Sequence, residues 1–292
     1  MLVKFAVIAG SASKDLGKRI ARRLKAPYVE AKTRVFPDGE SKITFGRIPK
    51  NSVILVVQST YPPVDTNLLQ ALSIISQARK VSSKIYAIIP YMGYARQDRQ
   101  FLSGEVVTMS IVARMLKSAG AKKIIVVDIH SKIALNHFKI PKENVSAIPE
   151  LAKYFKKMKL KDALVVSPDM GGALRAKKFA GLLQTNFIAL KKSRNRNTGK
   201  VVIQSSKVDV RGKDLILVDD IISTGGSIVK AAQFLKRQKC KRVFVACTHG
   251  LFVGDAEKKI KNAGVSRIIS TNTIPRNTSK VDISGVIADS IR

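Results

Sequence analysis

The sequence predicts an α/β fold of two tandem domains, each a mainly parallel sheet flanked by helices. Three observations support this prediction. Short runs rich in Val and Ile recur along the 292 residues, helix-like segments alternate with them, and one helix–strand unit is echoed further along the chain. Apolar residues make up 45% and charged residues 25% of the chain, which is typical of a globular protein and excludes a disordered chain, a collagen and a coiled coil.

The apolar runs have the length of β-strands, and most of them lack period-two alternation. Strands of this kind are buried on both faces, as in a parallel sheet. We expect them at residues 3–9, 53–57, 85–89, 124–128, 163–167, 215–218 and 243–247. The first run could pass for a weak signal peptide, but Lys4 interrupts it, and a buried first strand is the better interpretation.

Helix-like segments lie between these runs. We expect helices at residues 66–80, 105–119, 149–158, 171–183 and 226–239. The alternation of strand and helix predicts right-handed crossover connections within each sheet. Since no stretch reaches 18 apolar residues, the sequence predicts no membrane-spanning segment.

An internal echo suggests where the domains divide. Residues 116–130 (LKSAGAKKIIVVDIH) and 235–249 (LKRQKCKRVFVACTH) share Leu, Lys, Val and His in register. Either two helix–strand units resemble each other by chance, or an α/β domain has been duplicated. The stretch 140–150 (IPKENVSAIPE) contains two prolines and looks like a crossover linker. We therefore expect domains at residues 1–145 and 146–292.

The charge balance is unusual. Lys and Arg number 53 against 20 Asp and Glu, giving a net charge of +33. Such a surface attracts polyanions, including nucleic acid and phosphorylated metabolites, or it serves solubility. Aromatic residues are only 6% with no Trp, so base-stacking platforms have little support. The two cysteines, Cys240 and Cys247, fit neither a metal spacing nor a disulfide framework, which indicates a reducing, cytoplasmic setting.

The strongest motif is LILVDDIISTGGSIVKAA, residues 215–232. An apolar strand is expected to end in Asp219 and Asp220, and a polar loop is followed by a helix. Gly225 and Gly226 let backbone N–H groups approach an anion, and the helix N-terminus adds partial positive charge. The adjacent carboxylates suit sugar hydroxyls or a hydrated Mg²⁺. Because no Lys follows the glycines, this is not a Walker loop.

This segment resembles the phosphoribosyl-diphosphate motif shared by type I phosphoribosyltransferases and ribose-phosphate pyrophosphokinases. Further segments resemble the pyrophosphokinases alone, in the expected order and over about residues 5–290. They are FPDGE at 36–40, YMGYARQDR at 91–99, VDIHS at 127–131, SPDMGG at 167–172, KSR at 192–194, THGLF at 248–252 and TNTIP at 271–275. The length is similar to that of archaeal members, and the resemblance implies two phosphoribosyltransferase-like domains.

The resemblance also implies a Mg²⁺-dependent transfer of the β,γ-diphosphate of ATP to ribose 5-phosphate, giving phosphoribosyl diphosphate and AMP. The implied ATP-binding residues are Phe36, Asp38, Gly39, Glu40, Arg96, Gln97, Asp98 and Arg99. The implied ribose 5-phosphate-binding residues are Arg194, Asp219, Asp220, Ser223, Thr224, Gly225, Gly226 and Ser227. Lys192 and Arg194 are expected to be catalytic, and His130 and Asp169 are expected to hold the metal. His137 and His249 are interpreted as structural.

Two departures from the family pattern stand out. Ser223 occupies a position where many bacterial and eukaryotic members have Asp, and Asp65 and Thr66 stand where they usually have Asn and Asp. These changes leave oligomer size and regulation open. The resemblance implies a homo-oligomer, at least a dimer, because the adenine loop of the family reaches the ATP site of a neighbouring subunit.

Three alternatives remain at this point. A type I phosphoribosyltransferase would need only one α/β domain and neither the FPDGE nor the YARQDR segment. A non-catalytic regulatory relative would be expected to lose Lys192, Arg194, His130 or Asp169, and all four are present. A nucleic-acid binder would rest on charge alone.

Overall fold

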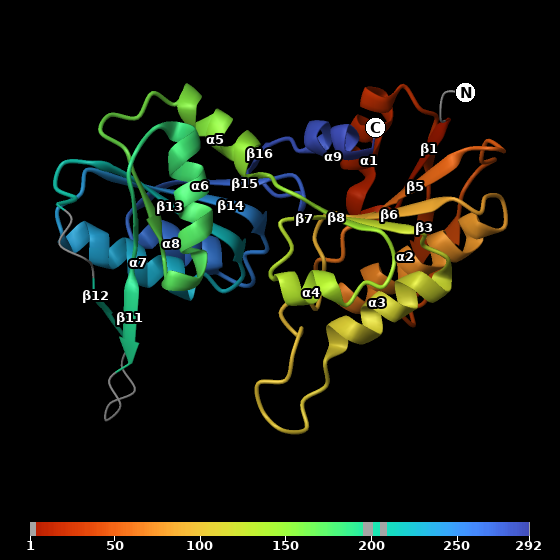
Figure 1. Cartoon of the computed structure of the whole chain (residues 1–292), viewed down its shortest axis with the longest axis horizontal. Coiled ribbons are helices and arrows are strands. Elements are labelled where there is room, and N and C mark those ends of the chain that lie inside the picture. Colours follow the sequence, from red (N-terminus) through yellow and green to blue (C-terminus); the bar gives the residue numbers. More distant parts are fainter. Residues whose placement is uncertain (1–3, 195–200, 205–208, 292) are drawn as a thin grey trace. The chain divides into compact units, whose positions relative to one another are not determined.

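The computed structural model describes residues 4–194, 201–204 and 209–291 (Figure 1). The chain forms two compact units. The first contains Met1–Ser146, Thr273–Pro275 and Ile283–Arg292, and the second contains Ala147–Asn272 and Arg276–Asp282. The sequence assigned everything after residue 145 to the second domain, whereas the last residues of the chain belong to the first unit.

The first unit is built on a parallel six-stranded sheet. Its strands lie in the order β2 (Tyr28–Glu30), β1 (Phe5–Ala9), β5 (Val53–Val57), β6 (Ile85–Ile89), β7 (Lys123–Val127) and β8 (Lys142–Val145). Figure 1 shows α2 (Val64–Arg79) and α3 (Thr108–Ala119) on one side of this sheet, and α1 (Lys14–Leu24) and α9 (Ser284–Ile291) on the other. Helices on both faces explain why β5 is apolar at every position.

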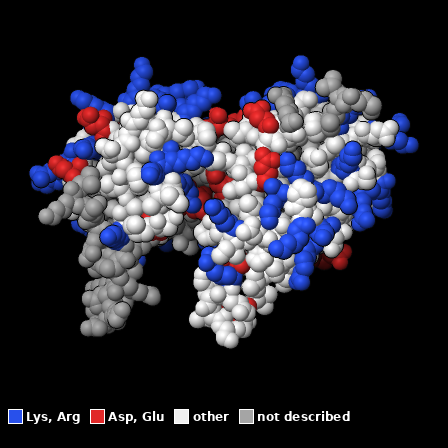
Figure 2. Space-filling model, in the orientation of Figure 1, with Lys and Arg blue, Asp and Glu red and all other residues white. Residues whose placement is uncertain are grey.

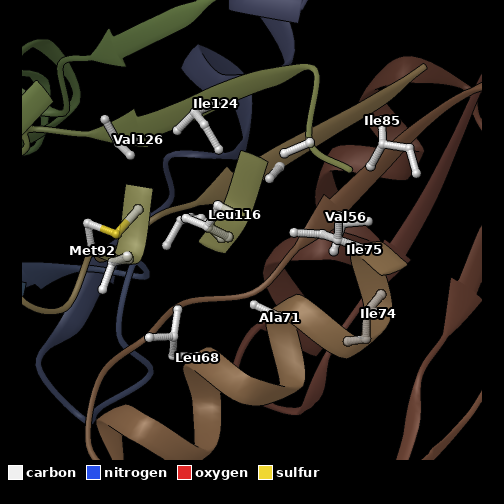
Figure 3. Close-up of a cluster of buried hydrophobic side chains, with 14 of the residues drawn as sticks. Val56, Leu68, Ala71, Ile74, Ile75, Ile85, Met92, Leu116, Ile124 and Val126 are labelled. Carbon is white, nitrogen blue, oxygen red and sulfur yellow. The ribbon is translucent and has the colours of Figure 1, made fainter. Parts of the chain in front are cut away.

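Figure 3 shows part of the core that α2 and α3 build against this sheet. Leu68, Ala71 and Ile74 project from α2, and Leu116 projects from α3. They meet strand residues such as Val56, Ile85 and Val126, all of which are fully buried. Apolar residues of α2 recur at the spacing that puts them on one helix face.

The second unit repeats the architecture with a second parallel six-stranded sheet. The strand order is β10 (Phe187–Ala189), β9 (Leu164–Ser167), β13 (Asp214–Ile222), β14 (Arg242–Gly250), β15 (Val265–Thr271) and β16 (Ser279–Val281). On one face α5 (Ile148–Lys157) and α6 (Ala173–Leu183) pack on Ile216 and Val218 of β13. On the other, α7 (Gly226–Arg237) and α8 (Ala256–Asn262) pack on Leu215 and Leu217.

The two sheets have the same topology. In each, the second strand of the unit lies at the edge, the first lies next to it, and the remaining four follow in chain order. In each unit a two-stranded antiparallel hairpin also follows the second strand. The hairpins are β3 (Lys32–Val35) with β4 (Ser41–Thr44), and β11 (Lys191–Arg194) with β12 (Val201–Gln204). The predicted α/β class with two parallel, helix-flanked sheets is therefore confirmed.

Three details of the sequence interpretation were wrong. The echo aligns β7, the fifth strand of its six-stranded sheet, with β14, which is the fourth strand of the other sheet. All helix–strand units of a parallel sheet share an amphipathic helix end and a buried strand. Two units can therefore have similar sequences although they occupy different positions in their sheets. The predicted linker at residues 140–150 contains the edge strand β8, although the chain does pass from the first unit to the second within it, between Ser146 and Ala147. Finally, β13 continues through Asp219 and Asp220 to Ile222, because β14 pairs with it to that point.

The start of the β13–β14 pair holds a buried charge. Asp214 is fully buried, and its two carboxylate oxygens accept hydrogen bonds from Arg242 Nε at 2.9 Å and Nη2 at 2.5 Å. The Arg242 hydrogen bond, acting against the effect of burial, holds the pKa of Asp214 below its usual value. A lowered pKa in the folded state stabilises the fold above the unfolded pKa near 4, and this contribution is lost as the pH falls.

We therefore expect Arg242→Ala to lower the free energy of unfolding at pH 7, because it removes the guanidinium that donates to both oxygens of the buried Asp214 carboxylate. The deficit should shrink as the pH falls below about 4, where Asp214 takes up a proton. Urea unfolding of both proteins from pH 3 to pH 7 measures this. Arg211→Ala, which removes an exposed pair with Asp209, is the control and should change stability little. A deficit that does not depend on pH would contradict this account.

The surface retains the basic character of the sequence. On the face shown in Figure 2, Lys and Arg side chains lie over both units, and acidic side chains are fewer. Among the described residues, no helix has the length and apolar character needed to cross a membrane.

Candidate active site

The acidic pair of the strongest motif lies at the carboxyl end of β13. Asp220 is buried and Asp219 is partly buried. Burial, followed by the negative charge of Asp220, raises the pKa of Asp219 above its usual value. Two adjacent carboxylates in such surroundings repel each other and need a partner.

Arg175 on α6 is that partner. Its Nη1 donates to Asp219 Oδ1 at 3.1 Å, and its Nη2 lies 3.1 Å from Asp220 Oδ2. One guanidinium therefore bridges both carboxylates, using the fork geometry that distinguishes Arg from Lys. Its path depends on Gly172, where an added Cβ would lie 2.6 Å from Ser167 Oγ and 3.2 Å from Arg175 Nη1.

The loop that follows the acidic pair has the geometry of an anion site. Gly225 adopts φ +75°, and a Cβ there would lie 2.9 Å from Ile260 Cδ1, so the position favours glycine. The helix α7 begins at Gly226, and Val229 N donates to the Gly225 carbonyl at 2.9 Å. Thr224, Gly226 and Ser227 are exposed, and Ser223 is partly buried. The backbone N–H groups of the first turn of α7 can therefore face a phosphate.

Asp169 lies in the same unit, directly after β9. Its Oδ1 accepts a hydrogen bond from Gly172 N at 3.2 Å and caps the short 3₁₀ helix Met170–Gly172. Its carbonyl oxygen accepts from Ser167 Oγ at 2.6 Å. The side chain is partly exposed, so the SPDMGG motif presents one carboxylate from a fixed turn.

In the first unit, the FPDGE motif forms the turn between β3 and β4. Phe36 N donates to Glu40 O at 2.8 Å, and Gly39 N donates to Phe36 O at 2.9 Å. Asp38 Oδ1 accepts from Glu40 N at 3.0 Å. Gly39 has φ +93°, which the turn requires. Asp38, Gly39 and Glu40 are exposed at the hairpin tip, while Phe36 is partly buried beside the Arg34 guanidinium, 5.1 Å from its ring centroid.

The YMGYARQDR segment follows β6 and is fixed at several points. Gly93 N donates to Thr60 Oγ1 at 2.7 Å, and a Cβ on Gly93 would lie 2.7 Å from Val64 Cγ1. The Tyr94 hydroxyl donates to Asp65 Oδ1, a bond that raises the pKa of Tyr94. Arg96, Gln97 and Arg99 are exposed. A fixed backbone thus presents polar side chains.

Asp98 differs from its neighbours, since its side chain is only 2% exposed. Its carboxylate accepts hydrogen bonds from Ser131 Oγ and from Arg99 Nε, the latter at 3.2 Å. Burial tends to raise the pKa of Asp98, but the hydrogen bonds from Ser131 and Arg99 outweigh it, and the pKa lies below its usual value. His130, next to Ser131, is exposed at the end of β7.

Comparison with known proteins decides the family. Residues 5–120 match the model of the N-terminal domain of ribose phosphate pyrophosphokinase, and residues 200–292 match that of the phosphoribosyl synthetase-associated domain. The ribose-phosphate pyrophosphokinase of Sulfurisphaera tokodaii is 37% identical over 98% of this chain and 99% of its own length. The chain belongs to the ribose-phosphate pyrophosphokinase family.

Further matches agree with this assignment. The ribose-phosphate pyrophosphokinase of Sulfolobus acidocaldarius is 38% identical over 96% of this chain and 97% of its own. The crystal structure of phosphoribosylpyrophosphate synthetase from Mycobacterium smegmatis superimposes with a TM-score of 0.87, at 31% identity, covering 99% of this chain and 98% of that one. This pyrophosphokinase family member therefore shares both units with its relatives.

The predicted catalytic pair lies on the hairpin of the second unit. Lys192 and Arg194 belong to β11, where their backbones pair with Ile203 and Val201 of β12. Their side chains lie outside the described residues. The roles of both residues therefore remain predictions.

The sequence did not indicate a role for Arg175, and it predicted a contact with ATP for Asp98. Arg175 is one of 53 basic residues and precedes Asp219 by 44 positions, so no local pattern signals their pairing. The alternation of strands and helices in a parallel fold could have predicted that the start of α6 lies beside the end of β13. It could not have predicted which basic side chain bridges Asp219 and Asp220. Asp98 was predicted among the ATP contacts, whereas the structure gives its carboxylate partners inside the protein.

Proposed function

We propose that this chain is a ribose-phosphate diphosphokinase, which transfers the β,γ-diphosphoryl group of ATP to the C1 hydroxyl of ribose 5-phosphate. The C1 oxygen attacks the β-phosphorus, the bond to the α-phosphate oxygen breaks, and the hydroxyl proton is released. The products are phosphoribosyl diphosphate and AMP. The observation that carries the proposal is the match to ribose-phosphate pyrophosphokinases over 98% of the chain.

Ribose 5-phosphate is assigned to the loop of the second unit. The first turn of α7 would bind the 5-phosphate through backbone N–H groups of Gly225, Gly226 and Ser227, with hydroxyls of Ser223 and Thr224. Asp219 and Asp220 would accept hydrogen bonds from the ribose hydroxyls. Their position at the carboxyl end of β13, next to this loop, supports the assignment.

ATP is assigned to the loops of the first unit. Phe36 would stack on the adenine, with Asp38, Glu40 and the backbone of Gly39 near the exocyclic amine. Arg96, Gln97 and Arg99 would bind phosphate oxygens and ribose or base edges. The exposure of these polar side chains on fixed turns supports the assignment.

Lys192 and Arg194 would neutralise charge on the equatorial oxygens of the transferred group, and Arg194 would also contact ribose 5-phosphate. Reactions of this type depend mostly on positioning and on charge neutralisation. A hairpin that belongs to neither six-stranded sheet suits such a role, because it can close over substrates without disturbing the core.

A magnesium ion is part of the proposal, with His130 and Asp169 as its holders. The described residues contain no cluster of three metal-binding side chains. Mg²⁺ that is carried by nucleotide phosphates keeps several waters and rarely needs an all-protein cage. Asp169 offers the oxygen ligand that Mg²⁺ prefers, and the His130 imidazole suits a water-mediated contact. When bound, the ion would neutralise phosphate charge.

The biological setting completes the proposal. A homo-oligomer, at least a dimer, would let the hairpin tip at residues 36–40 serve the ATP site of a second copy. Its exposed position supports this arrangement. The cytoplasm is the expected location, in line with the free, buried Cys240 and Cys247.

Product identity tests the proposal. Purified protein with Mg-ATP and ribose 5-phosphate should release AMP and phosphoribosyl diphosphate in equal amounts, as measured by chromatography of the nucleotides. Omission of ribose 5-phosphate should abolish AMP release. Formation of ADP would identify a monophosphoryl kinase instead, and a requirement for a nucleobase would identify a phosphoribosyltransferase.

A further inference from the structure

The buried Asp98 carboxylate connects two loops of the first unit that carry predicted ATP-site residues. Through its own segment it is next to Gln97, and through Ser131 it is next to His130. The Ser131 hydroxyl donates to Asp98 Oδ2 and accepts from Ala134 N at 2.9 Å, so it also caps α4 (Lys132–Asn136). A second link joins the Asp98 segment to the C-terminal end of α4, because His137 Nε2 donates to the Asp98 carbonyl oxygen at 2.8 Å.

The turn that carries His130 is held on both sides of this residue. Before it, Asp128 adopts φ +37°, and Ile129 N donates to Asn144 Oδ1 at 2.9 Å. After it, Ser131 is bonded to Asp98. His130 itself is exposed between these two attachments. The Asp98–Ser131 bond is therefore one of the attachments that place the His130 turn.

The segment that carries Arg96 and Gln97 is held in a similar way. Gly93 is bonded to Thr60 at one end, and Met109 N donates to Gln97 O at 3.1 Å at the other. Asp98 is the side chain through which this segment reaches the His130 turn. A direct contact with ATP would need an accessible carboxylate, and the Asp98 side chain is 2% exposed.

We propose that Asp98 is a positioning residue, which couples the Arg96–Gln97 segment to the His130 turn and so fixes the relative placement of the groups that receive ATP phosphates and their metal ion. This inference rests on the proposed function for its kinetic consequence. The coupling itself is a property of the first unit and can be measured without turnover.

The test uses three variants: Asp98→Asn, Ser131→Ala and the double variant that combines these two substitutions. Two further variants serve as controls. Ser131→Thr keeps a hydroxyl, and Glu30→Gln removes a surface pair with Lys14. Asp98→Asn and Ser131→Ala should each raise KM for Mg-ATP about 10-fold, the scale of one charged hydrogen bond, and leave KM for ribose 5-phosphate within about 2-fold. The double variant should be no worse than the worse single variant, because both remove one interaction. Ser131→Thr and Glu30→Gln should behave like wild type.

A spectroscopic signature separates positioning from mere loss of stability. In the ¹H–¹³C NMR spectrum, the His130 ring resonance should shift in Asp98→Asn and Ser131→Ala, and that of His249 in the second unit should stay in place. Additive effects of the two substitutions, or a raised KM with an unmoved His130 resonance, would overturn the inference and restore Asp98 as a direct ligand. Wild-type protein that releases no AMP would instead defeat the proposed function, and the NMR comparison would still decide the coupling.

Discussion

Replacing Lys192 with alanine should lower kcat on the order of 10²–10³-fold, which is the effect of removing one preorganised donor from a developing anionic transition state. The free energy of unfolding should change by less than about 0.5 kcal/mol, as for a typical surface substitution. The backbone of Lys192 pairs with β12 in a hairpin that belongs to neither six-stranded sheet. AMP release at saturating substrates and urea unfolding measure the two quantities.

The neighbouring lysine provides the control. Lys191 is exposed on the same strand, and Lys191→Ala removes the same charge from the protein. It should therefore retain kcat within about 2-fold, as expected for a surface substitution away from the reacting groups. If both variants lose activity equally, the hairpin contributes general positive charge. If Lys192→Ala keeps the wild-type rate, Lys192 has no part in the transfer.

Replacing Arg175 with methionine should lower kcat/KM for ribose 5-phosphate by about 10- to 150-fold, because hydrogen bonds to charged groups contribute about 1.5–3 kcal/mol. Without the guanidinium, Asp219 and Asp220 repel each other and no longer hold the arrangement in which both accept hydroxyl protons. The KM for Mg-ATP should change much less, since Arg175 contacts residues assigned to the other substrate. Initial rates with each substrate varied in turn give this split.

Two matched variants complete this experiment. Lys177→Met makes the corresponding change at an exposed position of the same helix and should leave both KM values unchanged. Arg175→Lys keeps the charge but not the fork, so it should recover only part of the loss. Equal losses for the two substrates in Arg175→Met would show that Arg175 supports the fold of the unit rather than the acidic pair.

The sequence predicted the interior of both sheets better than their edges. Strands such as β5 and β6 are covered on both faces and are therefore apolar throughout, a pattern that stands out without any structure. Edge strands can be polar, as in KENV of β8, and composition then resembles a loop. The helix α1 was missed for a related reason. Its Gly17 weakens the local signal, yet a Cβ at this position would lie 2.4 Å from Ala9 Cβ, so close packing on β1 requires it.

The sequence likewise revealed some residues of the candidate site and not others. Motifs that are contiguous in the chain, such as the loop at residues 223–227, could be found because their chemistry lies in successive residues. The partners of those motifs come from distant positions. Neither the Arg175 bridge nor the Asp98–Ser131 bond has a local signature, since folding alone brings each pair together.

The C-terminal helix has a consequence for how the protein is made. Ile287, Ala288 and Ile291 of α9 are buried in the first unit, and Arg23 Nε of α1 donates to Ser284 Oγ at 2.8 Å. During synthesis, residues 1–146 therefore leave the ribosome with the α9-binding surface of their sheet uncovered. Chains are synthesised at about 5–20 residues per second, and the α9-binding surface therefore stays exposed for several seconds before α9 is translated. The second unit can complete its fold before the first unit does, although most of its residues are translated later.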